Sequence, residues 1–228
     1  MWVVVPSKSL DRAKSRLASV LSMAERRNLV LAMLGDVLAT LAKSVGVEGI
    51  VVTSGEAAIS ALVASHGAEL YSSDGDRDLS SALASTNGFL QQRGANAVMV
   101  APGDIPLLGV SDVAAAVEAM GAGPTVILTP DNLGSGTNLL AMSSPELIPY
   151  LFGTNSFRRH ASAARARDIE PIILERPGLG LDIDAPADLC LFMENASPTR
   201  AYEYLVDSGI RHRLVAETEA TDALAKAG

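Results

Sequence analysis

Two acidic stretches carry the side chains best suited to binding a metal ion. The first, Ala101–Leu108, contains Asp104, and the second, Leu181–Asp188, contains Asp182 and Asp184. Both lie at the edge of a short apolar run that is typical of a strand, and ligands of open α/β sheets collect at the carboxyl ends of strands. Carboxylates that converge there could hold Mg²⁺, which takes one or two carboxylates plus substrate phosphates. Taken singly, either stretch could instead be a helix cap or a turn.

A basic segment follows the first apolar run of the chain. Lys8, Arg12, Lys14 and Arg16 come soon after Val3–Val5. Several cations at the carboxyl end of a strand suit a polyphosphate, because its charge needs more than one partner. The segment matches neither the P-loop nor the Gly-x-Gly-x-x-Gly pattern. A solvated basic loop is the alternative interpretation.

A second anion site is predicted at the glycine-rich segment Asp131–Asn138. Glycines let backbone N–H groups approach an oxyanion closely, and Thr137 adds a hydroxyl donor. A tight hairpin turn would explain the same glycines without any ligand.

The segment Phe152–His160 predicts a helix that begins with positive charge. Ser156 is predicted at the N-cap, so that Arg158, Arg159 and His160 fall in the first turn. Cations at a helix N-terminus oppose the helix dipole. We therefore predict that the arginines and the helix amides bind an anion together. The alternative is a surface basic helix paired with nearby acidic residues.

The chain alternates strands and helices along most of its length. Apolar runs predict strands at 3–5, 49–53, 68–71, 97–101, 125–129, 137–142, 169–174 and 180–183. Helical periodicity predicts helices at 22–44, 56–66, 79–93, 111–120, 156–167 and 186–195, the first opened by a capping box from Ser22 to Glu25. This alternation implies a mostly parallel sheet covered on both faces. The core is predicted to span residues 1–195, and residues 196–228 to form an appendage of one amphipathic helix and a fraying end.

Size, charge and cysteine content exclude several classes of protein. The 228 residues are enough for a sizeable core, and no apolar run has the ~18 residues of a membrane span. A formal net charge of −8 argues against a general nucleic-acid binder. The single cysteine, Cys190, excludes an internal disulfide framework and predicts a cytoplasmic protein. No Ser/His/Asp or Cys/His grouping for nucleophilic catalysis is evident.

Five motifs, taken together and in order, resemble one enzyme family. They are Val5-Pro-Ser-Lys8 with Ala13-Lys-Ser-Arg-Leu17, Gly103-Asp-Ile-Pro106, Gly134-Ser-Gly-Thr-Asn138, Phe152-Gly-x-x-Ser-Phe-x-Arg-His160 and Asp182-Ile-Asp-x-Pro-x-Asp-Leu189. Over about residues 2–195 the chain resembles the guanylyltransferases of coenzyme F420 biosynthesis. These enzymes are compact relatives of the molybdenum-cofactor and sugar nucleotidyltransferases.

The resemblance implies a Rossmann-like three-layer α/β/α nucleotidyltransferase fold with a mostly parallel mixed sheet. It also implies Mg²⁺-dependent transfer of GMP from GTP to 2-phospholactate, phosphoenolpyruvate or 3-phosphoglycerate, with release of pyrophosphate. For the GTP phosphates the resemblance implies Lys8, Lys14 and Arg16. For the metal it implies Asp104 and Asp182, with Asp184 as the less favoured ligand. For the acid it implies Thr137, Gly153 and Ser156, with Arg158, Arg159 and His160 nearby. Lys14, Asp104 and Asp182 are the predicted catalytic residues.

Two departures from the family pattern bear on substrate recognition. Leu79-Ser-Ser-Ala-Leu83 stands where relatives often have Leu-Asn-x-Ala-Leu, and Asn132 replaces a frequent arginine. Two other functions remain as alternatives, a sugar-phosphate or molybdopterin nucleotidyltransferase and a non-catalytic nucleotide-binding module. A Gly-rich first loop, usual in the former, is absent from the sequence. The sequence leaves the acceptor, the guanine-contacting residues and a homodimer open.

Overall fold

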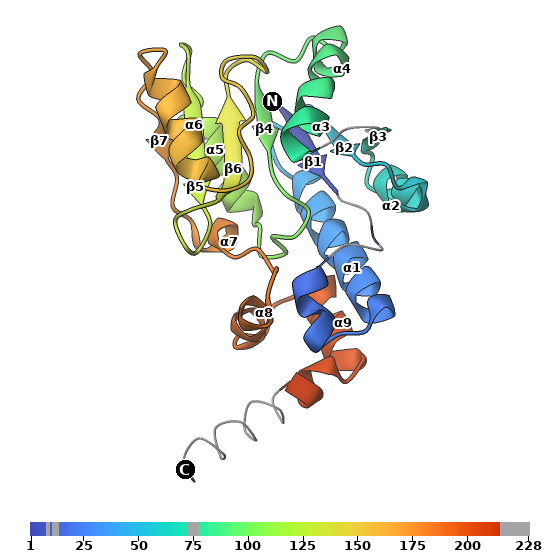
Figure 1. The fold of residues 1–228 in the computed structure, drawn as a ribbon. Helices are drawn as coiled ribbons and strands as arrows, with labels where there is room; N and C mark the ends of the chain where they lie inside the picture. Colours follow the sequence, from blue (N-terminus) through green and yellow to red (C-terminus); the bar gives the residue numbers. More distant parts are fainter. Residues whose placement is uncertain (8–9, 11–13, 73–77, 215–228) are drawn as a thin grey trace, which may run out of the picture.

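The fold is built on one mixed sheet, shown in the computed structural model of Figure 1, which describes residues 1–7, 10, 14–72 and 78–214. Its strands are ordered β3-β2-β1-β4-β6-β5-β7. Their bounds are β1 (Trp2–Pro6), β2 (Gly49–Thr53), β3 (Glu69–Tyr71), β4 (Val98–Val100), β5 (Val126–Pro130), β6 (Thr137–Met142) and β7 (Ile172–Ile173). β6 runs antiparallel to β4 and β5, and the other neighbours are parallel. The predicted mostly parallel mixed sheet is confirmed.

Helices cover both faces of this sheet. Side chains alternate along a strand, so Val3 and Val5 of β1 enter one buried cluster and Val4 enters another. The first cluster also takes in residues of α1 (Met23–Leu41), α2 (Ser60–Ser65) and α5 (Val110–Ala119). The second takes in residues of α3 (Leu79–Ser85), α4 (Asn87–Gln92) and α6 (Ser156–Arg165). The predicted three-layer α/β/α arrangement is confirmed.

The strand order creates a crevice at one edge of the sheet. The chain builds β2 and β3 on one side of β1 and then returns to place β4 on the other side. The loops that follow β1 and β4 therefore diverge from neighbouring carboxyl ends, at the lower edge of the sheet in Figure 1. Such a topological switch point is where open α/β sheets bind ligands.

The strand predicted at 180–183 is wrong. The helix α7 (Pro177–Gly180) takes the first of these residues, and 181–184 runs outside the sheet. One backbone hydrogen bond, from Ile183 N–H to the Asp104 carbonyl oxygen (3.1 Å), joins this segment to the loop after β4. Leu181 and Ile183 are buried against residues of α1 and α8 (Pro186–Met193). Apolar and acidic residues do alternate here as the sequence suggests, but Leu181 and Ile183 are buried against helices and do not pair in the sheet.

Other element boundaries differ from the sequence prediction in smaller ways. The predicted helix at 79–93 is broken at Thr86 into α3 and α4, because the Thr86 hydroxyl donates to the Leu83 carbonyl (2.6 Å) and competes with the helical ladder. The helix predicted at 56–66 begins as the 3-10 turn η2 (Ala57–Ile59), and the strand predicted at 169–174 is reduced to β7. The capping box at Ser22 and Glu25 is confirmed.

The C-terminal helix that the sequence predicts is present as α9 (Arg200–Asp207) and packs against α1. Its N-terminus is held by Asp36 of α1, whose carboxylate accepts the backbone N–H groups of Arg200 (2.8 Å) and Ala201 (2.9 Å). A third buried cluster joins this helix and residues 210–214 to α1, α8 and the 3-10 turn η1 (Ser15–Ser19). The described residues that follow α9, 210–214, form a further helical turn that includes His212.

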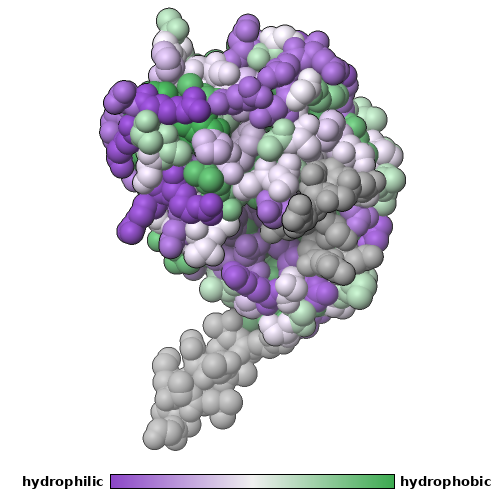
Figure 2. All heavy atoms as spheres, turned by 45° about the horizontal axis from the view of Figure 1, so that its top comes forward, coloured by the Kyte–Doolittle hydropathy of each residue, from purple (hydrophilic) through white to green (hydrophobic). Residues whose placement is uncertain are grey.

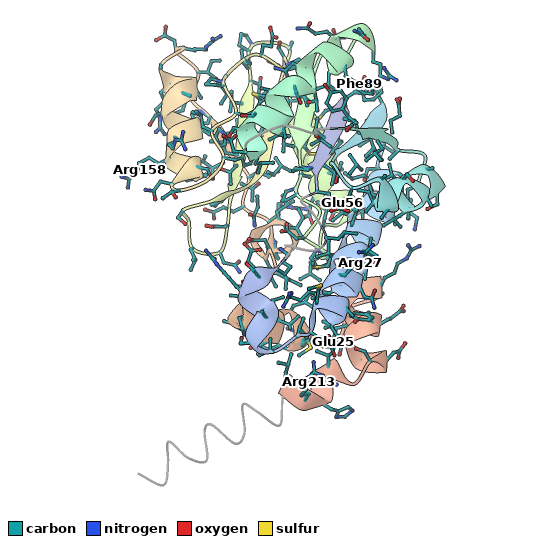
Figure 3. All side chains as sticks on the ribbon, turned by 45° about the vertical axis from the view of Figure 1, so that its right-hand side comes forward. Glu25, Arg27, Glu56, Phe89, Arg158 and Arg213 are labelled. Atoms are coloured by element: carbon teal, nitrogen blue, oxygen red, sulfur yellow. The ribbon has the colours of Figure 1, made fainter. Side chains whose placement is uncertain are left out.

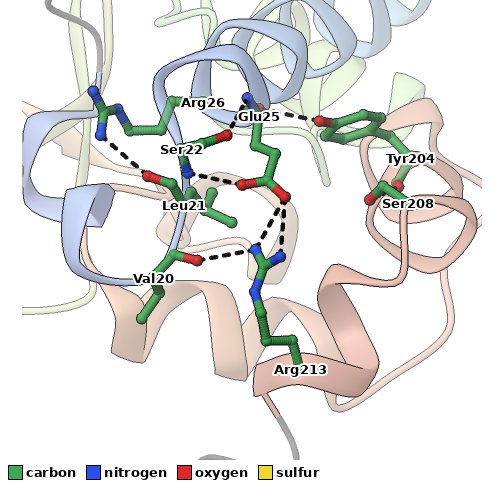
Figure 4. A network of polar contacts seen from close by, with 8 residues as sticks. All are labelled: Val20, Leu21, Ser22, Glu25, Arg26, Tyr204, Ser208 and Arg213. Atoms are coloured by element: carbon green, nitrogen blue, oxygen red, sulfur yellow. Dashed lines mark hydrogen bonds and ion pairs between the residues drawn. The ribbon is translucent and has the colours of Figure 1, made fainter.

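Polar contacts reinforce this third cluster beside η1 (Figure 4). The Arg213 guanidinium forms an ion pair with Glu25 (3.1 Å) and donates to the Val20 carbonyl (3.0 Å). Glu25 also closes the capping box by accepting the Ser22 backbone N–H (2.7 Å). The described C-terminal residues therefore hold the chain where it passes from η1 into α1.

On the face of the molecule that Figure 2 shows, hydrophilic side chains cover much of the surface and hydrophobic ones form small groups between them. In the described part of the chain, no helix combines the length and the apolar character that crossing a membrane requires.

Candidate active site

Lys14 lies at the centre of the crevice between β1 and β4. Its ammonium donates to Asp104 Oδ2 (2.5 Å) and to Asp184 Oδ1 (2.6 Å), and only 7% of its side chain is exposed. Lys14 precedes η1 with a left-handed backbone, φ 53°. This conformation costs a residue with a side chain on the order of 1 kcal/mol and is concentrated at functional sites. Here it coincides with a buried ammonium that joins two acidic loops.

The two aspartates keep Lys14 charged. Burial by itself would lower the pKa of the Lys14 ammonium, but the charges of Asp104 and Asp184 outweigh it and raise the pKa above its ordinary value. A charged ammonium that lines a pocket is suited to neutralising an anion.

The three predicted metal ligands are gathered by two loops. Asp104 follows β4, and the hydrogen bond between Ile183 and Asp104 aligns the second acidic stretch beside it. Leu181 and Ile183 are buried, so Asp182 and Asp184 alternate toward the crevice. Burial raises the pKa of Asp182, and the charges of Asp104 and Asp184 add to this rise. The carboxylates are therefore close enough to repel one another.

The donor chemistry of these residues fits Mg²⁺. Carboxylate oxygens are hard ligands of the kind that this ion prefers. The structure itself shows two of them converging on a positive charge, because the Lys14 ammonium lies between Asp104 and Asp184. Within the described ranges, no three acidic, histidine or cysteine side chains are arranged as a ready-made metal site. Asp104, Asp182 and Asp184 are thus the residues here whose chemistry could hold such an ion.

A pocket of about 300 Å³ opens in front of Lys14. Arg16, Asp104 and Asp184 line it together with Lys14, as do Ser7 and Gly103. The predicted phosphate ligands Lys14 and Arg16 therefore face one cavity with two of the acidic residues. Lys8 lies outside the described residues, so its predicted role stays a prediction.

The two predicted halves of the acid site meet where the β5–β6 turn touches the start of α6. Phe157 N–H donates to the Ser135 carbonyl (3.2 Å), and Ser156 N–H donates to the Gly153 carbonyl (3.1 Å). Gly153 has a φ of 108°, and a Cβ added there would meet nothing within 4 Å, so the space before it is open. The helix N-cap is Asn155, not Ser156 as the sequence predicted, because Asn155 tolerates the left-handed φ of 55°.

His160, Arg158 and Arg159 are placed very differently. The His160 ring is fully buried and contacts Thr137 and Leu151, and burial, helped by the charge of Arg159, lowers the pKa of His160 to about 4. Arg158 and Arg159 are exposed, and Arg158 points outward from the start of α6 (Figure 3). The histidine is thus neutral and internal, whereas the arginines are available to solvent anions.

Asn138 is a site residue to which the sequence assigned no role. Thr137 pairs with Pro130 and Leu139 pairs with Thr129, which leaves Asn138 as the extra residue of a β-bulge. Its amide donates to Asp182 Oδ1 (3.2 Å) and to the carbonyls of Leu179 and Gly180. The only signal in the sequence was its place at the end of the Gly134-Ser-Gly-Thr-Asn138 motif.

Comparison with known families decides the assignment. A family model described as guanylyl transferase, CofC like, matches residues 1–223. The chain belongs to this family. This CofC-like protein is therefore a nucleotidyltransferase and, more narrowly, a guanylyltransferase, as its five motifs predict.

Relatives of the CofC-like chain match it over most of its length. Phosphoenolpyruvate guanylyltransferase of Rubrobacter xylanophilus is 36% identical over 189 residues, 83% of this chain and 91% of that protein. 2-Phospho-L-lactate guanylyltransferase of Methanothermobacter thermautotrophicus is 32% identical over 202 residues, 89% and 88% of the two chains. A nucleotidyl transferase structure from the same genus, at 18% identity, superposes with a TM-score of 0.62 over 85% of this chain and 95% of the other, which shows a shared fold.

Proposed function

We propose that this enzyme transfers GMP from GTP to a phosphorylated three-carbon acid and releases pyrophosphate, in coenzyme F420 biosynthesis. The acceptor is 2-phospholactate, phosphoenolpyruvate or 3-phosphoglycerate. The observation that carries the proposal is the buried Lys14 ammonium between Asp104 and Asp184 at the switch point of the sheet. The names of the relatives support the acceptor class. We also infer a cytoplasmic location from the lone free cysteine.

The donor phosphates bind in the pocket in front of Lys14. Lys14 and Arg16 line this pocket and supply positive charge from the loop after β1, and Lys8 is proposed to join them. Several cations are required because a nucleoside triphosphate carries several negative charges, and charge-assisted hydrogen bonds to phosphate are stronger than neutral ones.

The chemistry needs no general base on the enzyme. An oxygen of the acceptor's phosphate attacks the α-phosphorus of GTP, forming a new P–O bond while the bond from the α-phosphorus to the pyrophosphate oxygen breaks. The attacking phosphate oxygen is already ionised at neutral pH. The protein therefore contributes by positioning the two substrates and by neutralising charge on the departing pyrophosphate. Lys14 has the charge for the second task.

Nucleotidyltransferases typically depend on a metal ion, and we propose Mg²⁺ held by Asp104, Asp182 and Asp184. When bound, the ion would neutralise phosphate charge beside the point of transfer. Asn138 orients Asp182 by donating to one of its oxygens, which leaves the other oxygen for the ion.

The acid would bind at the β5–β6 turn and the start of α6. A phosphorylated acid has two anionic groups, which need separate sets of donors. Thr137 with Gly153 and Ser156 forms one set, and Arg158 and Arg159 supply the second. A sugar phosphate has only one strong anion and would leave part of this surface unpaired, at a cost in affinity.

A substrate panel tests the proposal. Pyrophosphate release is measured with GTP, ATP, CTP or UTP against each of the three acids and against glucose 1-phosphate. We expect GTP and at least one acid to be preferred, with no release in the absence of Mg²⁺. Activity confined to the sugar phosphate, or indifference to the base, would contradict the proposal.

Alanine variants of the acidic residues test the metal site with the same assay. Asp104→Ala is expected to lose metal-dependent turnover and to keep its circular dichroism spectrum. A matched control, Glu170→Ala, changes an exposed acid that pairs with Arg165 on the surface. If Asp184→Ala lost metal-dependent turnover to a comparable extent and Asp182→Ala did not, the second metal ligand would be Asp184 rather than Asp182.

A further inference from the structure

His160 is the buried link between the two halves of the acid site. Its side chain is 0% exposed and lies on α6, one turn beyond Ser156. One ring nitrogen, Nδ1, is 3.0 Å from Thr137 Oγ1 on β6. The other, Nε2, is 2.8 Å from the backbone nitrogen of Leu151.

The contact with Leu151 determines which ring nitrogen carries the proton. A backbone N–H can only donate, so Nε2 must accept and cannot hold a proton. The proton of the neutral ring is therefore on Nδ1, and Nδ1–H donates to Thr137 Oγ1. Burial disfavours the doubly protonated ring, which would also set two N–H groups against each other at Nε2.

This tautomer has a consequence for Thr137. A hydroxyl has one proton to donate and two lone pairs with which to accept. Because Nδ1–H occupies one lone pair, the hydroxyl proton of Thr137 is directed away from the ring. A hydroxyl held this way favours a partner that only accepts, such as an ionised carboxylate or phosphate oxygen.

The same ring holds the opposite half of the site. Leu151 precedes the loop that contains Gly153, and its N–H is fixed by Nε2. The next N–H, of Phe152, donates to Ser80 Oγ (3.0 Å), and the Phe152 ring packs edge-on against His160 with centroids 4.9 Å apart. A single imidazole thus sets the spacing between Thr137 and the Gly153 loop.

We propose that His160 is a positioning residue that makes the Thr137 hydroxyl a donor to the anionic acceptor and fixes its distance from the Gly153 loop. The inference rests on the proposed function, because it takes Thr137 as a contact of the acid. His160 itself touches no substrate atom. Its effect is on acceptor binding, and the GTP pocket lined by Lys14 is left unchanged.

Two substitutions separate the two ring contacts. Asn places its amide near the position of Nδ1, so His160→Asn keeps a donor to Thr137 and loses the Leu151 contact. Gln reaches the position of Nε2, so His160→Gln keeps the Leu151 contact and loses the donor. We expect His160→Gln to raise the KM for the acceptor about tenfold and His160→Asn less, with the KM for GTP within about twofold of wild type. A role limited to filling volume predicts the reverse order, because Gln is closer to His in size.

Coupling to Thr137 is tested by a double-mutant cycle. Thr137→Val is expected to raise the acceptor KM, and adding His160→Gln to it should cause little further loss, because both changes remove one interaction. Additive losses would overturn the inference. His66→Gln, at the end of α2, is the matched control, and the thermal midpoint of each variant reports whether it folds.

A measurement on the wild-type protein avoids the risk that a variant fails to fold. Nitrogen-15 NMR of the histidine rings distinguishes protonated from unprotonated ring nitrogens. Protonated Nδ1 and bare Nε2 at His160 are expected, and the opposite tautomer would overturn the inference. An unchanged acceptor KM in Thr137→Val would instead refute the Thr137 contact in the proposed function. Impairment by Thr137→Val with no effect of His160→Gln would refute the positioning role alone.

Discussion

The local electrostatics at Lys14 explain why its backbone conformation is tolerated. A left-handed backbone and a buried ammonium are both unfavourable by themselves. Asp104 and Asp184 offset these costs by surrounding the ammonium, and Lys14 in turn screens the acids from one another and from Asp182. Lys14 is therefore the counter-ion of these acids in the structure, and the proposed function makes it a phosphate ligand as well.

Replacing Lys14 separates these two roles. Lys14→Ala is expected to lower kcat/KM for GTP by on the order of a hundredfold, because a charge that stabilises the leaving phosphate is lost. Lys14→Arg should also be impaired, because a planar guanidinium does not reproduce a compact ammonium. Steady-state kinetics with GTP as the varied substrate provide the measurement.

The counter-ion role has its own readout. Without the ammonium, the acids repel one another, so added Mg²⁺ should raise the thermal midpoint of Lys14→Ala more than that of wild type. Lys43→Ala, at the exposed end of α1, is the control. An unchanged dependence on GTP in Lys14→Ala would contradict the assignment.

At the scale of elements, the junction of β6 and α6 depends on a neutral His160. Its pKa of about 4 lies below the ordinary value of 6.5, so the unfolded chain binds more protons between these two values. The free energy of unfolding must then fall as the pH falls through this window. The full difference amounts to about 3 kcal/mol.

Denaturant titrations from pH 7 to pH 4 measure this dependence. Between pH 7 and pH 4, the free energy of unfolding of wild type should fall by more than that of His160→Gln, because the variant has no imidazole at position 160 to protonate. The control His66→Gln keeps the buried imidazole of His160, so its stability should depend on pH in the same way as that of wild type. Parallel curves for wild type and His160→Gln would show that His160 is not held neutral by the fold.

At the scale of the whole molecule, the site is assembled between three buried clusters. The two clusters that flank the sheet place the ends of β1 and β4 side by side. The third packs the C-terminal helices against η1 and against Leu181 and Ile183. Lys14 immediately precedes η1, and Asp182 and Asp184 flank Ile183. The packing of the C-terminal segment therefore helps to position both Lys14, which precedes η1, and the stretch that contains Asp182 and Asp184.

Truncation tests this dependence and the predicted domain boundary at 195. A chain ending at residue 195 loses the buried side chains Ala201, Leu205, Ile210 and Leu214. Each large one contributes roughly 1.5–3 kcal/mol, which together approaches the 5–15 kcal/mol of a typical domain. We expect the truncated chain to be insoluble or to melt at a much lower temperature. A chain ending at Leu214 is the control, and full activity of the shorter chain would show that residues 1–195 are sufficient.

Much of the fold was predictable because its signals are local. The apolar run Val3–Val5 predicts the strand that the structure shows as part of β1, and the capping residues Ser22 and Glu25 start α1 where the sequence indicates. Repeated strand–helix alternation implies the layered α/β class by itself. The acidic and basic motifs indicate a site for phosphates and a metal ion from residue type and order along the chain alone.

Tertiary structure decided what depends on contacts between distant segments. The sequence predicts a strand at 180–183, yet helices bury Leu181 and Ile183, because an apolar pattern indicates burial and not the partner. Asn138 reaches Asp182 only because a β-bulge turns it. The Leu151 N–H decides which ring nitrogen of His160 carries the proton. Lys14 binds Asp104 and Asp184, which lie 90 and 170 residues further along the chain. Residue types thus determined which chemistry this chain can perform, and long-range packing determined which atoms are held together to perform it.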